Sequence, residues 1–169
     1  PVVGVYVNCQ HVNTEYRVLS RVTTSLLEEF RNRKGSYEFS KHNLPSRIPH
    51  TGWPVDLLFD IFKKVVDLEQ KFVIIALDEI DKLTDKGDNL LYKLSRLNAE
   101  LVQSKVSVVG ISNNATFLDF LDPRVKSSLG EAQVVFPPYN AQQLQDILKE
   151  RVKLSFKPGV VTEEAIKLC

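Results

Sequence analysis

An unbroken run of six apolar residues, Phe72–Leu77, is followed at once by two acidic residues, Asp78 and Glu79. The run is far shorter than the roughly 20 residues that cross a membrane, and it lacks the polar alternation of a strand with one solvated face. A continuous apolar run of this length is typical of a strand buried on both faces, as the strands of parallel sheets are. The run therefore favours an α/β fold.

The rest of the chain alternates similar runs with helical spacing. Short runs rich in β-branched and aromatic residues predict three more strands, at Val2–Val7, Val106–Ile111 and Ala132–Phe136. Apolar residues three and four positions apart predict helices at Asn13–Arg33, from Thr51 to about Glu69, and at Leu90–Leu101. Strands that alternate with helices indicate repeated βα units, and so a mainly parallel sheet with helices on both faces.

Helical spacing returns near the end of the sequence. Asn140 is placed to cap a helix over Gln142–Leu154, and Thr162–Leu168 begins another helix. Both helices follow the last predicted strand. We therefore expect an α/β core over residues 1–138 and the beginning of a small helical unit over 139–169.

The overall charge says little about partners. The formal net charge is +1, so no global field favours or excludes nucleic acid, and any DNA-binding surface must be local. The two cysteines, Cys9 and Cys169, lie far apart without a CxxC spacing, which suits a reducing cytoplasm. Because the longest apolar run is too short for a membrane span, we expect no membrane partner.

Three polar side chains stand where ligands bind in an open parallel sheet, at the carboxyl ends of strands. Asp78 and Glu79 have the pattern of a Walker B pair, in which the first carboxylate holds Mg²⁺ through water and the second orients the attacking water. Asn113 follows the strand Val106–Ile111 and could position that water beside the γ-phosphate. The alternative is that all three merely end strands and cap the following turns.

Several motifs in fixed order make the assignment specific. They are Leu77–Asp81, Leu91–Asn98, Gly110–Asn114, Leu121–Leu129 and Phe136–Asn140. Together they closely resemble the archaeal origin-recognition/cell-division-control initiators, a clade of AAA+ ATPases. The similarity continues upstream through Tyr16–Leu19 and Thr51-Gly52 and downstream through Phe156–Val160, so it covers nearly the whole chain.

The resemblance implies a P-loop NTPase-like sheet followed by a helical lid, and a slow ATPase that binds ATP or ADP with Mg²⁺. It implies recognition of double-stranded origin DNA, recruitment of the replicative helicase, and assembly with other initiator subunits. Asp78 would hold Mg²⁺, Glu79 would complete the Walker B pair, and Asn113 would be the sensor 1 residue. The expected location is the cytoplasm, in association with the nucleoid.

Initiators of this kind carry a DNA-contacting insertion, which here would fall within about Ser36–Phe62. Gly35–Gly52 is rich in turn-forming residues, which predicts a long loop that could include a short turn of helix. Lys41, Arg47 and His50 are the basic residues of this loop that suit phosphate contacts. The alternative is an ordinary solvated surface loop.

Arg124 is the candidate for an arginine finger. Many AAA+ proteins place this finger in a Ser-Arg pair just before a glycine, but here Ser128 stands at the matching position, ahead of Leu129-Gly130. This departure favours a structural salt bridge as the role of Arg124, with the finger as the alternative.

No GxxxxGKS or GxxxxGKT sequence occurs in the chain, so the Walker A loop that cradles phosphates is missing. The resemblance places that loop after a central strand between Val106–Ile111 and Ala132–Phe136, and it places a winged-helix domain downstream. We therefore expect the chain to be part of an ATPase domain that does not bind ATP tightly alone. Two other functions stay open: a clamp-loader or signalling AAA+ ATPase, and a degenerate AAA+ module that acts only in DNA binding or assembly.

Overall fold

A computed structural model gives the arrangement of most of the chain. It describes residues 2–45, 47–49, 51–69, 72–83, 88–129 and 132–168, without the side chains of residues 36–40 and 69. The chain divides into two compact units, Pro1–Ala132 and Gln133–Cys169. Each unit is described by itself.

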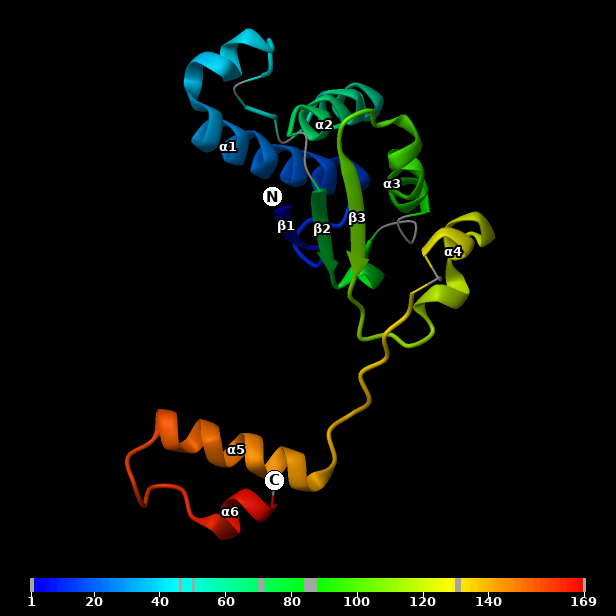
Figure 1. Cartoon of the computed structure of the whole chain (residues 1–169). Helices are drawn as coiled ribbons and strands as arrows, with labels where there is room; N and C mark the ends of the chain where they lie inside the picture. The colour runs from blue at the N-terminus through cyan, green and yellow to red at the C-terminus, as the bar shows by residue number, and fades with distance from the viewer. Residues whose placement is uncertain are drawn as a thin grey trace. The chain divides into compact units, whose positions relative to one another are not determined.

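A parallel sheet forms the centre of the first unit (Figure 1). Its strands are β1 (Val2–Asn8), β2 (Phe72–Asp78) and β3 (Lys105–Gly110), in the order β1-β2-β3. In the register of this sheet, Val3 lies beside Val73 and Val73 beside Val106, while Asn8 lies beside Asp78 at the carboxyl ends. The parallel sheet and three of its predicted strands are thus confirmed.

Three long helices connect the strands: α1 (Glu15–Lys41), α2 (Val55–Glu69) and α3 (Asp88–Glu100). Their buried apolar faces share one hydrophobic cluster with alternate residues of the strands. Within α1, Gly35 adopts φ 80°, a left-handed conformation that glycine tolerates, so the regular helix breaks where the sequence indicated. After this break the backbone is helical again from Ser36 to Lys41, which extends the expected short turn.

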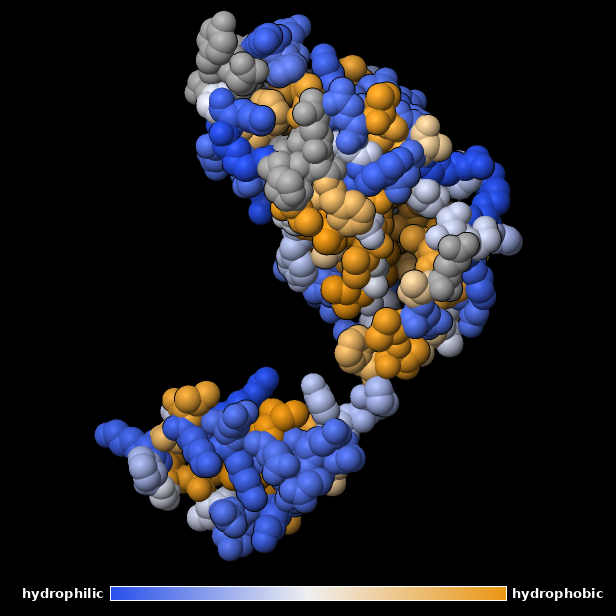
Figure 2. All heavy atoms as spheres, viewed as in Figure 1, coloured by the Kyte–Doolittle hydropathy of each residue, from blue (hydrophilic) through white to orange (hydrophobic). Residues whose placement is uncertain are grey.

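Among the described residues, one face of the sheet is fully buried and the other is partly exposed, contrary to the expectation for Phe72–Leu77. On β2, Val73, Ile75 and Leu77 are buried, whereas Phe72 is 44 % exposed. The strands lie in the sheet in the same order as in the sequence, β1-β2-β3. Right-handed crossovers between successive strands then place every connecting helix on the same side of the sheet. Figure 2 shows hydrophobic side chains gathered over the strands on the other face of this unit. The prediction of a strand covered on both sides is therefore wrong for the described residues.

The strand predicted at Ala132–Phe136 does not form. The segment has no regular structure, and Val134 and Phe136 are 76 % and 88 % exposed. A strand requires the backbone hydrogen bonds of a neighbouring strand, and none of the described strands pairs with this segment. Its apolar, β-branched composition is thus not sufficient to fix its conformation.

Three short elements were not expected from the sequence. They are the 3₁₀ turns η1 (Ile80–Lys82) and η3 (Phe117–Phe120) and the helix α4 (Pro123–Leu129). Elements this short contain too few residues for a helical period to stand out. Pro123 at the first position of α4 was the one available signal, because proline is favoured there.

The second unit holds α5 (Ala141–Ser155) and α6 (Glu163–Leu168), as the spacing predicted. Asn140 caps α5: its Oδ1 accepts from the Gln143 backbone N–H, and Gln143 Oε1 accepts from the Asn140 N–H, both at 2.9 Å. The assignment of 1–138 as an ATPase core and 139–169 as a lid stays a prediction. Among the described residues, no helix is both long enough and apolar enough to cross a membrane.

Candidate functional site

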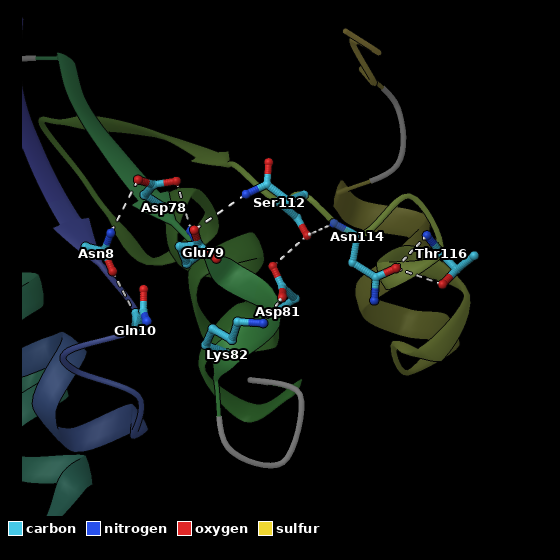
Figure 3. A network of polar contacts seen from close by, with 10 residues as sticks. Asn8, Gln10, Asp78, Glu79, Asp81, Lys82, Ser112, Asn114 and Thr116 are labelled. Carbon is cyan, nitrogen blue, oxygen red and sulfur yellow. Dashed lines mark hydrogen bonds and ion pairs between the residues drawn. The ribbon is translucent and has the colours of Figure 1, made fainter. Parts of the chain in front are cut away.

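The candidate site lies where β1 and β2 end and where the chain leaves β3. The Asp78 carboxylate accepts three hydrogen bonds there. Tyr6 Oη donates to Oδ2 at 2.5 Å, Asn8 Nδ2 lies 3.5 Å from the same oxygen, and the Glu79 backbone N–H donates to Oδ1 at 2.9 Å. The contact with Asp78 is the main reason that the pKa of the Tyr6 phenol is raised. Figure 3 shows Asn8 and Glu79 on either side of the Asp78 carboxylate.

Glu79 has a left-handed backbone, with φ 52° and ψ 42°. For a residue other than glycine this conformation costs about 1–3 kcal/mol, and it persists only where the surroundings impose it. Two backbone bonds impose it here: Ile80 N–H donates to the Ile111 carbonyl at 3.1 Å, and Ile111 N–H donates to the Leu77 carbonyl at 2.9 Å. The turn after β2 is thereby fastened to the segment after β3.

That fastening brings the third candidate residue to the acidic pair. Asn113 Nδ2 lies 3.5 Å from Glu79 Oε1, at the long end of hydrogen-bond range. The structure therefore brings Asp78, Glu79 and Asn113 together at one edge of the sheet, although they come from two separate parts of the sequence.

Asp81 and Ser112 support the same turn (Figure 3). Ser112 Oγ donates to Asp81 Oδ1 at 2.7 Å, and Lys82 Nζ lies 3.0 Å from Asp81 Oδ2. The Ser112 hydrogen bond, aided by Lys82, holds the pKa of Asp81 below its ordinary value. The sequence predicted no role for Tyr6, Asn8, Asp81 or Ser112. The available signals were the strand alternation that places Tyr6 and Asn8 on one face and the motifs that contain Asp81 and Ser112.

The carboxylates at this edge suit a magnesium ion that is also held by phosphate oxygens. They do not suit a metal site in which protein side chains supply all the ligands. The described residues contain no group of three or more His, Cys, Asp or Glu side chains that could hold a metal. Mg²⁺ commonly takes one or two carboxylates and completes its shell with water and phosphate oxygens. A carboxylate offers about four acceptor positions, and the three donors to Asp78 leave capacity for a metal-bound water.

The basic candidates lie elsewhere. Lys41 ends α1 and Arg47 follows in the next loop, and both side chains are exposed. In Figure 1 the end of α1 lies toward the start of β2, away from the strand ends that carry Asp78. His50 lies outside the described residues. The structure therefore does not bring Lys41 and Arg47 to the acidic edge.

Arg124 has partners within the chain. Its Nε and Nη2 lie 3.0 and 2.9 Å from the two carboxylate oxygens of Asp122, and its guanidinium lies 5.1 Å from the centre of the Tyr92 ring. Hydrogen bonds from Arg124 lower the pKa of Asp122 to about 2. The arrangement matches the salt bridge that we weighed against a finger role, and the finger role itself stays untested.

Known proteins provide an independent comparison. No family model matches the chain. The ORC1-type DNA replication protein of Pyrococcus furiosus is 48% identical over 170 residues, which cover all of this chain and 37% of that protein. The ORC1-type DNA replication protein 1 of Methanosarcina mazei is 46% identical over 165 residues, which cover 98% of this chain and 36% of that protein. The chain thus spans a little over a third of the length of these curated relatives.

Solved structures agree with this similarity. The ORC1 protein of Aeropyrum pernix, solved in complex with DNA, matches the whole chain with a TM-score of 0.79 and 39% identity, over 39% of its own length. The Cdc6p protein of Pyrobaculum aerophilum matches with a TM-score of 0.64. The match covers 99% of this chain and 39% of that protein. At 20% identity, the second match supports the fold alone.

Proposed function

Because the chain is homologous over its whole length to the archaeal ORC1-type DNA replication proteins, we propose that it forms part of the ATPase domain of a replication initiator. In this proposal the protein recognises origin DNA in an ATP-dependent manner and recruits the replicative helicase. The observation that carries the nucleotide part is the meeting of Asp78, Glu79 and Asn113 at one sheet edge. The complex of the Aeropyrum relative with DNA supports the DNA part.

Each residue of the edge has a proposed task. Asp78 accepts hydrogen bonds from water held by Mg²⁺, and Glu79 orients the attacking water through its carboxylate. Asn113, whose amide lies 3.5 Å from Glu79, is the sensor 1 residue that positions this water beside the γ-phosphate. Mg²⁺, when bound, neutralises negative charge on the phosphates. Since the sequence contains no GxxxxGKS or GxxxxGKT, we propose that another segment supplies the loop that cradles the phosphates.

The DNA contacts and the finger are separate proposals. Lys41, Arg47 and His50 suit phosphate contacts in the segment within about Ser36–Phe62, and the exposure of Lys41 and Arg47 supports this role. For Arg124 to act on the nucleotide of a neighbouring subunit, its guanidinium would have to leave the Asp122 carboxylate.

A chimeric protein tests the nucleotide proposal. In it, this chain replaces the matched 170-residue segment of the Pyrococcus furiosus relative. Calorimetry of Mg·ATP binding compares the chain alone, the chimera, the chimera with Asp78→Asn, and a control with Asp119→Asn, an exposed acid that pairs with Lys126. We expect the chimera and the control to bind, the chain alone to bind weakly or not at all, and Asp78→Asn to weaken binding at least tenfold.

Absence of binding by the chimera would remove the nucleotide proposal and favour a module for DNA binding or assembly.

DNA binding separates the remaining alternatives. An origin-containing duplex should bind the chimera more tightly than a scrambled duplex of equal length, and the double change Lys41→Glu and Arg47→Glu should weaken both. Equal affinity for both duplexes would favour another class of AAA+ ATPase.

A further inference from the structure

Tyr6 reaches the Asp78 carboxylate from the neighbouring strand. Its side chain lies on the sheet face that the described helices leave uncovered, and the residue is 60 % exposed. Its phenol nevertheless donates a hydrogen bond to Asp78 Oδ2 at 2.5 Å, at the short end of the range for O–H···O bonds. The hydroxyl of this exposed tyrosine thus contacts a residue of the candidate site, and the Asn8 side chain is its second hydrogen-bond partner.

The register of the sheet explains how the contact arises. Tyr6 is paired with Ala76, two positions before Asp78, so the phenol must span a diagonal between the strands. Asn8, which is directly paired with Asp78, reaches the same oxygen only at 3.5 Å. A tyrosine has the length for the diagonal contact, and Tyr6 therefore makes the shorter of the two side-chain bonds to Oδ2.

These bonds hold the carboxylate at both ends. Oδ1 accepts the Glu79 N–H and Oδ2 accepts the Tyr6 hydroxyl, so the otherwise broad torsion of the carboxylate is restrained. We propose that Tyr6 is a positioning residue that orients the Asp78 carboxylate toward the Mg²⁺ of a bound nucleotide. The inference rests on the proposed function, because it assigns Tyr6 to the site in which Asp78 holds the metal.

A purely structural role predicts different behaviour. It predicts that loss of the hydrogen bond lowers the melting temperature and weakens nucleotide binding by the same factor with and without the metal. A positioning role predicts instead that the metal-dependent part of nucleotide binding changes while the metal-free part does not. The ratio of ADP dissociation constants measured in EDTA and in Mg²⁺ isolates the metal-dependent part.

The test uses Tyr6→Phe in the chimeric protein, with ADP as the probe and calorimetry as the assay. Tyr16→Phe is the matched control, because it also loses a phenol hydrogen bond, to the Pro49 carbonyl at 2.9 Å. We expect Tyr6→Phe to reduce the Mg²⁺-dependent gain in affinity about fivefold, with the affinity in EDTA unchanged. Tyr16→Phe should keep the full gain.

The proposed nucleotide site and the positioning role of Tyr6 fail on different results. If the unaltered chimera gains no ADP affinity from Mg²⁺, the proposed nucleotide site fails and the inference about Tyr6 fails with it. If the unaltered chimera shows the gain and Tyr6→Phe keeps it or increases it, only the positioning role is overturned. Equal losses of affinity in EDTA and in Mg²⁺, together with a lower melting temperature, would also overturn it and assign Tyr6 a structural role.

Discussion

Replacing Asp67 with alanine removes an acceptor that three consecutive backbone N–H groups share. Oδ1 of Asp67, on α2, accepts from the N–H groups of Gln103 at 2.7 Å, Ser104 at 3.0 Å and Val102 at 3.2 Å. These donors belong to the connection between α3 and β3, so the carboxylate fixes the entry of β3 into the sheet.

The size of the effect follows from the burial of each donor residue. Ser104 is 1 % exposed, so its N–H cannot readily find water, and an unsatisfied buried donor costs about 1–3 kcal/mol. Val102 is 85 % exposed and Gln103 is also exposed, so water replaces most of what their N–H groups lose. We expect Asp67→Ala to lower the free energy of local opening at Ser104 by about 2 kcal/mol, which is roughly a thirtyfold change in the opening equilibrium.

Hydrogen exchange measured by mass spectrometry in the chimeric protein reads this opening from peptides that contain Val102–Ser104. Asp67→Asn keeps a neutral acceptor and should give an intermediate loss of protection. The control is Asp60→Ala on the same helix, where the exposed carboxylate pairs with Lys63 within one turn. If Asp67→Ala leaves the protection of Ser104 within about threefold of the unaltered protein, the shared-acceptor reasoning is wrong.

The same site predicts a pH dependence with a definite sign. Burial raises the pKa of Asp67, but the three backbone N–H donors outweigh it and the net pKa is lowered. A lowered folded-state pKa gives stability that is present above the unfolded value of about 3.9 and is lost as the pH falls through the folded value. The protection difference between the unaltered protein and Asp67→Asn should therefore persist at neutral pH and shrink below about pH 4. A difference that grows with acid would contradict this sign.

Two further substitutions test other parts of the fold, again by hydrogen exchange in the chimera. Asn140→Ala removes the cap of α5 and should lower the protection of its first turn by about 1 kcal/mol, whereas Asn140→Ser should keep most of this protection. Equal loss of protection in the two variants would exclude a capping role. A Cβ at Gly110 would meet Ile80 Cδ1 at 2.9 Å, so Gly110→Val should loosen the turn after β2 by roughly 1–3 kcal/mol. Gly4→Val, where a Cβ meets nothing within 4 Å, is the matched control, and similar losses in both would rule out overpacking.

Much of the fold and the centre of the site could be predicted from local pattern. The spacing of apolar residues located α2, and the run Phe72–Leu77 placed Asp78 and Glu79 at the end of a strand. Asn140 predicted the start of α5, because the side chain of an N-cap residue accepts a hydrogen bond from a backbone N–H within three residues. These predictions succeeded because the interactions that decide them lie close together in the sequence.

The tertiary structure decided what depends on distant partners. An apolar run has the same composition whether or not its second face is covered. Only the order of the strands and their crossovers showed that the described helices cover one face of β2 and leave the other partly exposed. The segment Ala132–Phe136 has the residues of a strand but has no strand partner among the described residues. Tyr6 and Asn8 reach Asp78 because of a register between strands that are about seventy positions apart in the sequence. Sequence pattern fixes which residues favour a strand, whereas pairing, cover and register depend on hydrogen bonds and packing from remote segments.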